Sequence, residues 1–433
     1  MKPPARYPQS DYKVLKKESY MDFDLFKLDF HETMKKVMYF RGKKVKVLFD
    51  GLLVEVCSHL NLSKWALANY VAEGFSCNLV TIQRFFYSKC HFPVYLTKHL
   101  ILKLPKNKQV YFFDEFNSKT EKLKFGVSHT WINFPKRINA ELAWICGAVA
   151  ADGWITREKK TRREKMGIVD QNKKTVLKAQ KYFKKVFDCR TKFRRDYCED
   201  CWHLIIDSIS VTRFFTTFLG FHYGVKAHDI CEPQVVKSSE FRTNFASGVM
   251  SFDGSVELDG KISLGVKSKQ LAIDVQDILL VGGLSTKISR NKQGLYIMKS
   301  GSLLNNKDIN KWVNFFDVKT EKGYRLYYLT HGFTRVAKGE SEAIDSLVKF
   351  SRYPKTRPCP IYKIFKILKI KKSVKKQDLQ KFAGIGHATL YKYTWLLRKA
   401  NIVHCDDGYF GRGHFNFYEF NPNVSEWRLP MAF

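Results

Sequence analysis

The sequence predicts an α+β fold built from two consecutive pseudo-symmetric halves, each with the element order αββαββα, and one further domain on either side. A short pattern occurs twice, as ICGAVAADG at 145–153 and as ASGVMSFDG at 246–254, and each copy reads as an apolar helix that ends in Asp-Gly. The periodicities after the two copies also match, which indicates two copies of one supersecondary unit. We expect an N-terminal helical, helix-turn-helix-like domain over 1–135, the first half over 136–235, the second half over 236–350 and a C-terminal winged-helix-like domain over 356–433.

The elements of each half follow its Asp-Gly step. For the first half, apolar alternation and helical spacing predict strands at 154–157 and 166–171, a helix at 175–187, a hairpin at 190–195 and 202–207, and a helix at 211–219. For the second half, the same reasoning predicts strands at 255–258 and 261–266, a helix at 269–280, strands at 286–290 and 295–299, and a helix at 308–316.

Small residues form a stripe on each motif helix. The stripes are Ala143, Gly147 and Ala150 on one helix and Asn244, Gly248 and Ser251 on the other. Their spacing lets two helices approach at backbone distance. If the helices pack in this way, Asp152 and Asp253 meet at two helix C-termini, where the helix dipole disfavours negative charge and the carboxylates repel each other. A divalent cation removes both objections, and Mg²⁺, or Mn²⁺ in its place, prefers carboxylate and water ligands.

At these residues the chain resembles the LAGLIDADG homing endonucleases in their single-chain form with two motifs. Asp152 and Asp253 align with the final acid of the motif, which the resemblance implies to be the metal ligand. The chain departs from the motif at its first acid, replaced by Ala150 and Ser251, and at its leading leucine, replaced by Ile145 and Ala246. The resemblance covers about 136–330 and implies metal-dependent hydrolysis of both strands of duplex DNA across the minor groove.

Catalysis of this kind also needs groups that position water and phosphate near the metal. We expect these at the rims of the two acids: Gln171 at the end of a first-half strand and Lys226 in the sequence GFHYGVKA. By the repeat, Lys267 or Ser268 parallels Gln171, and Lys322 or Lys319 parallels Lys226. A single lysine at any of these places is also consistent with a simple phosphate contact.

The charge of the chain indicates a polyanionic partner. Lys and Arg number 75 against 41 Asp and Glu, a formal net charge of +34. No apolar run long enough for a membrane span or a secretion signal is present, so we expect a soluble intracellular protein without a membrane partner. Side chains on the predicted strands would contact DNA bases or phosphates: Lys165, Arg194, Arg195, Arg290 and Lys292.

The two flanks add candidate DNA-binding modules. Helices predicted at 64–72 and 79–87 resemble a helix-turn-helix, with Ser63 as a cap, Gly74 in the turn and Arg84 facing the groove. After a proline-rich linker, helices at 362–370, 376–382 and 387–400 and a hairpin resemble a winged helix, with Gly384 and Gly386 in its turn. On its third helix the outward residues are Thr389, Lys392 and Arg398. Either flank could instead be a packing or protein-contact module.

The ten cysteines are scattered, as is usual in a reducing compartment. Cys198 and Cys201, in the sequence CEDC, have metal-ligand spacing, with His203 two residues on and Cys189 before them. A structural zinc site needs four ligands, and the same residues also fit a plain hairpin turn.

These observations favour a monomeric, site-specific double-strand DNA endonuclease that uses Mg²⁺ or Mn²⁺ and a long target site. Two alternatives remain open: a DNA-binding transcriptional regulator with an endonuclease-like core, and a maturase that binds intron RNA. Asp152 and Asp253 favour the enzyme, because a regulator has no need for two mutually repelling acids.

Overall fold

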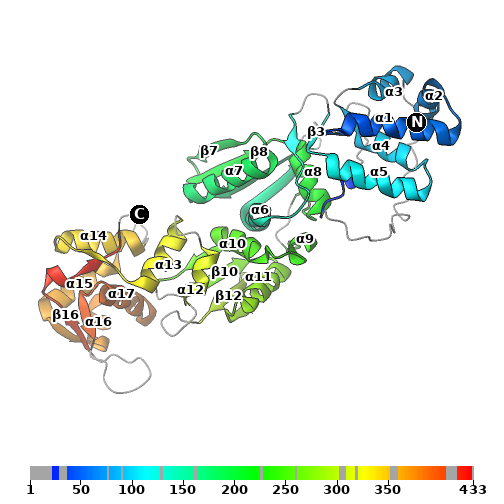
Figure 1. Ribbon diagram of the computed structural model, residues 1–433. Helices are drawn as coiled ribbons and strands as arrows, with labels where there is room; N and C mark the ends of the chain where they lie inside the picture. Colours follow the sequence, from blue (N-terminus) through cyan, green and yellow to red (C-terminus); the bar gives the residue numbers. More distant parts are fainter. Residues whose placement is uncertain are drawn as a thin grey trace. The chain divides into compact units, whose positions relative to one another are not determined.

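The structure is a computed structural model of the 433-residue chain (Figure 1). It describes residues 22–28, 37–75, 78–88, 91–126, 130–158, 164–224, 228–258, 261–301, 309–316, 320–351, 359–405 and 417–431. The chain divides into two compact units. The first contains the chain up to Ile138 together with 187–189 and 209–218, and the second contains the remainder. Among the described helices, none is both long and apolar enough to cross a membrane.

The N-terminal unit combines helices with a small antiparallel sheet. Its helices are α1 (Val45–Leu60), α2 (Lys64–Gly74), α3 (Leu79–Phe86), α4 (Val94–Ile101) and α5 (Lys106–Lys119). Its strands are β1 (Met38–Arg41), β2 (Phe92–Pro93), β3 (Lys122–Phe125) and β4 (Ile132–Asn133), in the order β2-β1-β3-β4. The sequence predicts a helical domain without this sheet, because strands of two to four residues are too short to show a period-two pattern.

Local capping places α2 and α3 where the sequence predicts them. The Ser63 hydroxyl accepts a hydrogen bond from the backbone N–H of Ala66 at 3.1 Å, which confirms Ser63 as the N-cap of α2. The Asn78 side chain caps α3 by accepting from the N–H of Val80 at 2.8 Å. Arg84 on α3 is exposed.

Helix α8 (Ile209–Phe218) belongs to the N-terminal unit. The ring of Phe214 lies 4.8 Å from that of Phe23, and the Arg213 guanidinium lies 4.4 Å from the ring of Phe125. The sequence predicts this helix as the last element of the first half. Its aromatic face contributes to the core of the N-terminal unit.

The first half contains α6 (Ala140–Asp152), β5 (Gly153–Arg157), β6 (Glu164–Asp170), α7 (Lys173–Phe187), β7 (Lys192–Asp196) and β8 (Cys201–Ile206). Its antiparallel sheet has the order β5-β6-β8-β7. Met166, Ile168, Leu204 and Ile206 are fully buried on one face. Since side chains alternate along a strand, the intervening residues form a second, more open face.

The second half repeats this arrangement. It contains α10 (Arg242–Phe252), β9 (Gly254–Val256), β10 (Ile262–Val266), α11 (Lys269–Val281), β11 (Thr286–Arg290) and β12 (Tyr296–Ser300). Its sheet order, β9-β10-β12-β11, matches that of the first sheet strand for strand. The half continues into the short helix α12 (Ile309–Trp312), a 3-10 turn at Val313–Phe315 and helix α13 (Glu321–His331).

The registers of the two sheets also agree. One row of Cα partners crosses the first sheet through Gly153, Ile168, Leu204 and Phe193. The corresponding row of the second sheet runs through Gly254, Leu264, Met298 and Ile288. Each row begins at the glycine that follows a motif aspartate. The match therefore assigns an equivalent position in the second half to each strand residue of the first.

The C-terminal elements are α14 (Glu340–Ser351), α15 (Pro360–Lys371), β14 (Ser373–Lys375), α16 (Lys376–Ala383), α17 (His387–Lys399), β15 (Val403–Cys405) and β16 (Phe417–Phe420). The three strands form a sheet in the order β14-β16-β15. Gly384 ends α16 in the left-handed region at φ 63° and Gly386 is the N-cap of α17, so both glycines lie in the predicted turn. Last in the described chain, β17 (Arg428–Leu429) pairs with β13 (Arg335–Val336).

Candidate active site

Helices α6 and α10 pack against each other, and Figure 1 shows their labelled ribbons side by side. A Cβ atom added to Gly147 would lie 2.0 Å from the carbonyl oxygen of Phe245, and one added to Gly248 would lie 2.2 Å from that of Trp144. The two glycines also meet each other, because each added Cβ would lie 3.0 Å from the other glycine's Cα. This reciprocal contact confirms the close helix approach that the small-residue stripes predict.

The two motif aspartates occupy the C-terminal ends of this helix pair. Asp152 is the last residue of α6, and Asp253 is the C-cap of α10, where its backbone N–H donates to the carbonyl of Val249 at 3.0 Å. Both side chains are partly exposed. A Cβ on the following residue, Gly153 or Gly254, would lie within 2.7 Å of backbone in the preceding helical turn. The glycine that follows each aspartate is thus a steric requirement of the step from helix to strand.

Lys322, near the start of α13, lies beside the end of α10. Its Nζ donates to the carbonyl oxygen of Ser251 at 3.0 Å and also to that of Phe252, the two residues before Asp253. A cation is favourable at these last carbonyls of a helix. Burial lowers the pKa of Lys322, and the negative charges of Asp170, Asp253 and Asp152 act in the opposite direction. The structure therefore brings one predicted lysine into the same electrostatic environment as both predicted acids.

Asp170 is a member of this group that the sequence analysis misses. It is the last residue of β6, and of the three acids it has the largest effect on Lys322. Because Gly153 is the partner of Ile168, the end of β6 runs past the end of α6. In the second sheet the equivalent position is Val266. The available signal was the position of an acid at a strand end, directly before the predicted Gln171.

Of the residues predicted at the rims of the two acids, some are exposed, one is buried, and two are not among the described residues. Gln171 is exposed directly after β6, and the sheet register makes Lys267, also exposed after β10, its equivalent. Ser268 is instead buried as the N-cap of α11, where its hydroxyl accepts from the N–H of Leu271 at 3.2 Å. Lys226 and Lys319 lie outside the described residues.

The open face of the first sheet carries two of the predicted DNA contacts. Lys165 on β6 alternates with buried Met166, and Arg194 on β7 is the partner of His203. Arg195 has the opposite orientation along the strand, and its guanidinium lies 2.6 Å from the Asp200 carboxylate.

On the second sheet the exposed cations of the open face are ones that the sequence analysis misses. Lys287 and Lys299 are direct cross-strand partners and both are exposed. Like charges directly opposite each other destabilise a sheet unless an anion lies over them. The predicted Arg290 has the alternate orientation and lies 5.6 Å from the Tyr296 ring, whereas Lys292 is exposed in the turn. The strand register determines which of these lysines and arginines lie on the open face, and the sequence alone does not determine the register.

Helix α17 is more buried than a helix that enters a DNA groove would be. Five consecutive residues, from Tyr393 to Leu397, are buried, so more than one face is packed. Lys392 is an ion-pair partner of Glu257, the residue after β9, at 2.6 Å. Thr389 and Arg398 are partly buried. The outward orientation expected for Lys392 therefore differs from the observed one, because the helix packs against the second half as well as its own domain.

Comparison with known proteins gave matches among solved structures alone. No protein-family model and no curated protein sequence matches the chain. The homing endonuclease I-DmoI, solved in complex with DNA and Mn, is 14% identical over 37% of this chain and 89% of its own, with a TM-score of 0.31.

Two further solved structures have similar values. The homing endonuclease I-WcaI bound to its DNA recognition sequence is 16% identical over 43% of this chain and 85% of its own, with a TM-score of 0.32. The N-terminal LAGLIDADG domain of DUF199/WhiA is 8% identical over 41% and 80%, with a TM-score of 0.29. The chain is thus similar to LAGLIDADG homing endonucleases and to a LAGLIDADG domain of another protein.

Proposed function

We propose that the chain is a site-specific double-strand DNA endonuclease that hydrolyses phosphodiester bonds with a divalent cation. The observation that carries the proposal is the position of Asp152 and Asp253 at the adjacent ends of two helices in main-chain contact. Packing alone gives no reason to place two carboxylates at helix C-termini, where the helix dipole disfavours them.

The donor set fits Mg²⁺ or Mn²⁺. Carboxylates are the ligands that these cations prefer, and the backbone carbonyls at a helix C-terminus add negative potential. Asp152 and Asp253 would hold the metal. When bound, a divalent cation neutralises charge that develops on the phosphate during hydrolysis.

The remaining groups have roles that follow from their positions. Lys322 is held by two carbonyls next to Asp253, so its ammonium is fixed where it can attract a scissile phosphate. Gln171 and Lys267 occupy equivalent exposed positions after β6 and β10, and they would orient water or phosphate on the two sides. Asp170 would act through Lys322 as a positioning residue.

The open sheet faces would bind the duplex. Lys165 and Arg194 on the first sheet, and Lys287 and Lys299 on the second, supply cations for phosphates or base edges. The net charge of +34 supports a long contact with a polyanion. Both acids lie in one chain, so a monomer is sufficient for two cuts.

The regulator and maturase alternatives predict a different use of the same surface. A regulator would bind duplex DNA without needing the acids, and a maturase would prefer folded intron RNA at equal salt concentration. Neither alternative explains the placement of Asp152 and Asp253.

The test is metal-dependent cleavage of a library of randomised DNA duplexes, with cut ends captured by adaptor ligation and sequenced. The wild-type chain should cut both strands at one site class with Mg²⁺, and excess chelator should stop the reaction. Asp152→Asn and Asp253→Asn should each abolish double-strand cleavage but retain DNA binding, and Asp277→Asn, at an exposed acid on α11, should cut normally. Wild-type cleavage by either motif variant, or in excess chelator, would contradict the proposal.

A further inference from the structure

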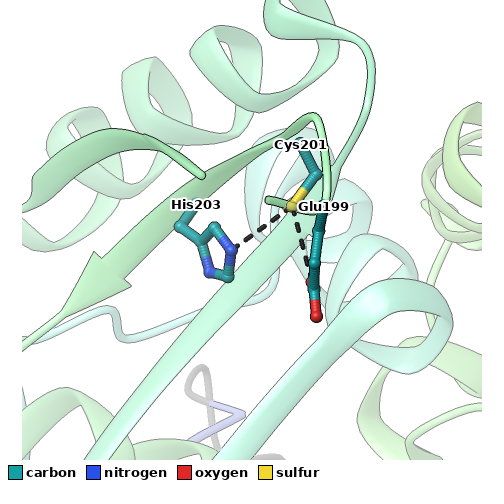
Figure 2. Close-up of side chains that lie close together, drawn as sticks. All are labelled: Glu199, Cys201 and His203. Carbon is teal, nitrogen blue, oxygen red and sulfur yellow. Dashed lines mark hydrogen bonds between the residues drawn. The ribbon is translucent and has the colours of Figure 1, made fainter. Parts of the chain in front are cut away.

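The β7–β8 hairpin gathers three different metal-binding side chains. Donor atoms of Glu199, Cys201 and His203 all lie within 4.8 Å of one another. Figure 2 shows the Cys201 sulfur between the other two side chains, joined to each of them by a dashed line. Cys201 and His203 share one face of β8 because they are two residues apart on a strand, and Glu199 reaches them from the turn.

The distances between these donors fit a single small ion. The Cys201 Sγ lies 3.4 Å from His203 Nε2 and 3.8 Å from Glu199 Oε2. A fourth donor is adjacent, because Asp196 Oδ2 lies 3.8 Å from the same His203 nitrogen. In a tetrahedral site with metal–ligand bonds of about 2.0 to 2.3 Å, neighbouring donors are separated by roughly 3.3 to 3.8 Å. These three separations lie in that range. Asp196 is outside the group whose donors all lie within 4.8 Å of one another, so its carboxylate would move closer to Cys201 or Glu199 to complete the set.

The burial of the group combines a protected interior with an accessible edge. Cys201 is 5% exposed, and the side chains of His203 and Asp196 are 15% and 32% exposed. Glu199 is exposed in the turn. An ion could therefore enter from solvent and lose most of its hydration shell to protein ligands.

The ligand set differs from the Cys198 and Cys201 pair that the sequence spacing indicates. Cys198 is exposed and outside the group, and its backbone N–H donates to Asp196 Oδ1 at 2.9 Å. Cys189 is buried in the N-terminal unit. The strand geometry thus selects Cys201 and His203 and replaces the other two cysteines with carboxylates.

We propose that this hairpin binds Zn²⁺ through Cys201, His203, Glu199 and Asp196. Thiolate, imidazole and carboxylate together are a donor set typical of zinc and unlike the all-oxygen set of a Mg²⁺ site. The site is specific to the first half. At the equivalent positions of the second half stand Leu295, Ile297 and Asn291, and Asn291 pairs with Leu295 as Asp196 pairs with Cys201.

The location gives the metal a structural role on the open sheet face. β7 is an edge strand, and the proposed ligands join its last residue, Asp196, to the turn and to β8. Arg194, the cross-strand partner of His203, lies on the same face. Zinc would therefore fix the hairpin beside a cation that the proposed function assigns to DNA. The metal site itself does not depend on that function.

The test titrates Co²⁺, a spectroscopic substitute for Zn²⁺, into the purified metal-free full-length chain. One equivalent should produce the intense visible bands of tetrahedral cobalt and a thiolate-to-cobalt charge-transfer band, and Zn²⁺ should displace both. Oxygen-only coordination at the motif aspartates gives no charge-transfer band, so Asp152→Asn with Asp253→Asn should leave the spectrum unchanged.

Single variants then identify the ligands. Cys201→Ser should remove the charge-transfer band, and Glu199→Gln, at an exposed turn position, should weaken Co²⁺ binding at least about tenfold without loss of folding. Cys198→Ser, three residues before Cys201, is the matched control and should bind as the wild type does. Absence of the band in the wild type, or its loss in Cys198→Ser with retention in Cys201→Ser, would overturn the proposal. Nuclease activity plays no part in this readout.

Discussion

Strand order and register are the same in the two halves, but the side chains at equivalent positions are not. The row that starts at Gly153 in the first sheet has its counterpart at Gly254 in the second. At the end of the second strand, however, the first half carries Asp170 and the second half carries Val266. The repeated main chain sets where groups can stand, and the divergent side chains set what each half can do there.

The first test asks whether α6 and α10 contribute equally to the helix contact at Gly147 and Gly248, which we call the seam. Gly147→Ala and Gly248→Ala should each destabilise the second unit by about 3 kcal/mol or more, because each Cβ would overlap a backbone carbonyl that cannot move independently of its helix. Urea unfolding measures the effect. Gly51→Ala is the matched control, because a Cβ there meets nothing within 4 Å, and it should stabilise α1 by about 0.5 to 1 kcal/mol. Clearly unequal effects of the two seam variants would show that only one helix determines the contact.

The ion pairs on the two motif helices should contribute very different amounts to the free energy of unfolding. In the second half, Arg242 on α10 binds Glu232 in bidentate fashion at 2.6 and 2.9 Å, and the Glu232 side chain is fully buried. Glu232→Gln should cost about 3 kcal/mol, because it removes the buried carboxylate charge that the partly buried guanidinium of Arg242 hydrogen-bonds. Urea unfolding of the variant against wild type at one salt concentration measures this loss. A variant as stable as the wild type would mean that the pair is not part of the native core.

The first-half pair, Glu141 with Lys185, should matter far less. Lys185 is largely exposed, so Glu141→Gln should leave the unfolding midpoint close to that of the wild type at neutral pH. The hydrogen bond from Lys185 lowers the pKa of Glu141 below its usual 4.5. The contribution of this pair is therefore present above pH 4.5 and is lost as the pH falls through the folded-state pKa. Unfolding curves of wild type and variant should converge at acidic pH, and divergence on acidification would contradict the assigned sign.

Asp170 offers a test of chemical asymmetry within the proposed function. Because Val266 stands at the equivalent position, Asp170→Asn should slow the cut of one DNA strand by roughly tenfold and leave the other unchanged, so nicked duplex accumulates. Strand-labelled substrates followed over time give the two rates. Asp229→Asn, at an exposed acid, is the control. Equal slowing of both strands would show that Asp170 serves the whole site and not one half.

The effects expected on DNA affinity are small. Lys287→Gln and Lys299→Gln should each weaken duplex binding by a few fold and reduce the slope of log K against log salt by about 1. The first-half counterpart of Lys287 is Lys192, and Lys192→Gln should have less effect, because Lys192 already lies 3.6 Å from Asp207. Fluorescence anisotropy at several salt concentrations distinguishes the cases. An unchanged slope for both second-half variants would remove that sheet face from the proposed DNA contact.

Features that depend on residues close together in the sequence are predictable from it, and features that depend on distant residues are not. The seam was predictable because Gly147 and Gly248 lie in stripes that repeat every three to four residues, and Ser63 because a cap is local. Register was not predictable, which is why Arg195 and Arg290 were favoured over Lys287 and Lys299. Domain packing was equally hidden, since nothing near Lys392 in the sequence indicates Glu257, 135 residues away.

The main-chain contact between Gly147 and Gly248 also restricts how the proposed DNA substrate can be cut. Helices separated by side chains can drift apart or together as their cores mutate, but helices whose glycines touch have no spacer left to vary. The distance between Asp152 and Asp253 is then fixed by the helix contact. Under the proposed function, base preferences can change through substitutions on the sheets, while the stagger between the two cuts stays constant for as long as both glycines remain.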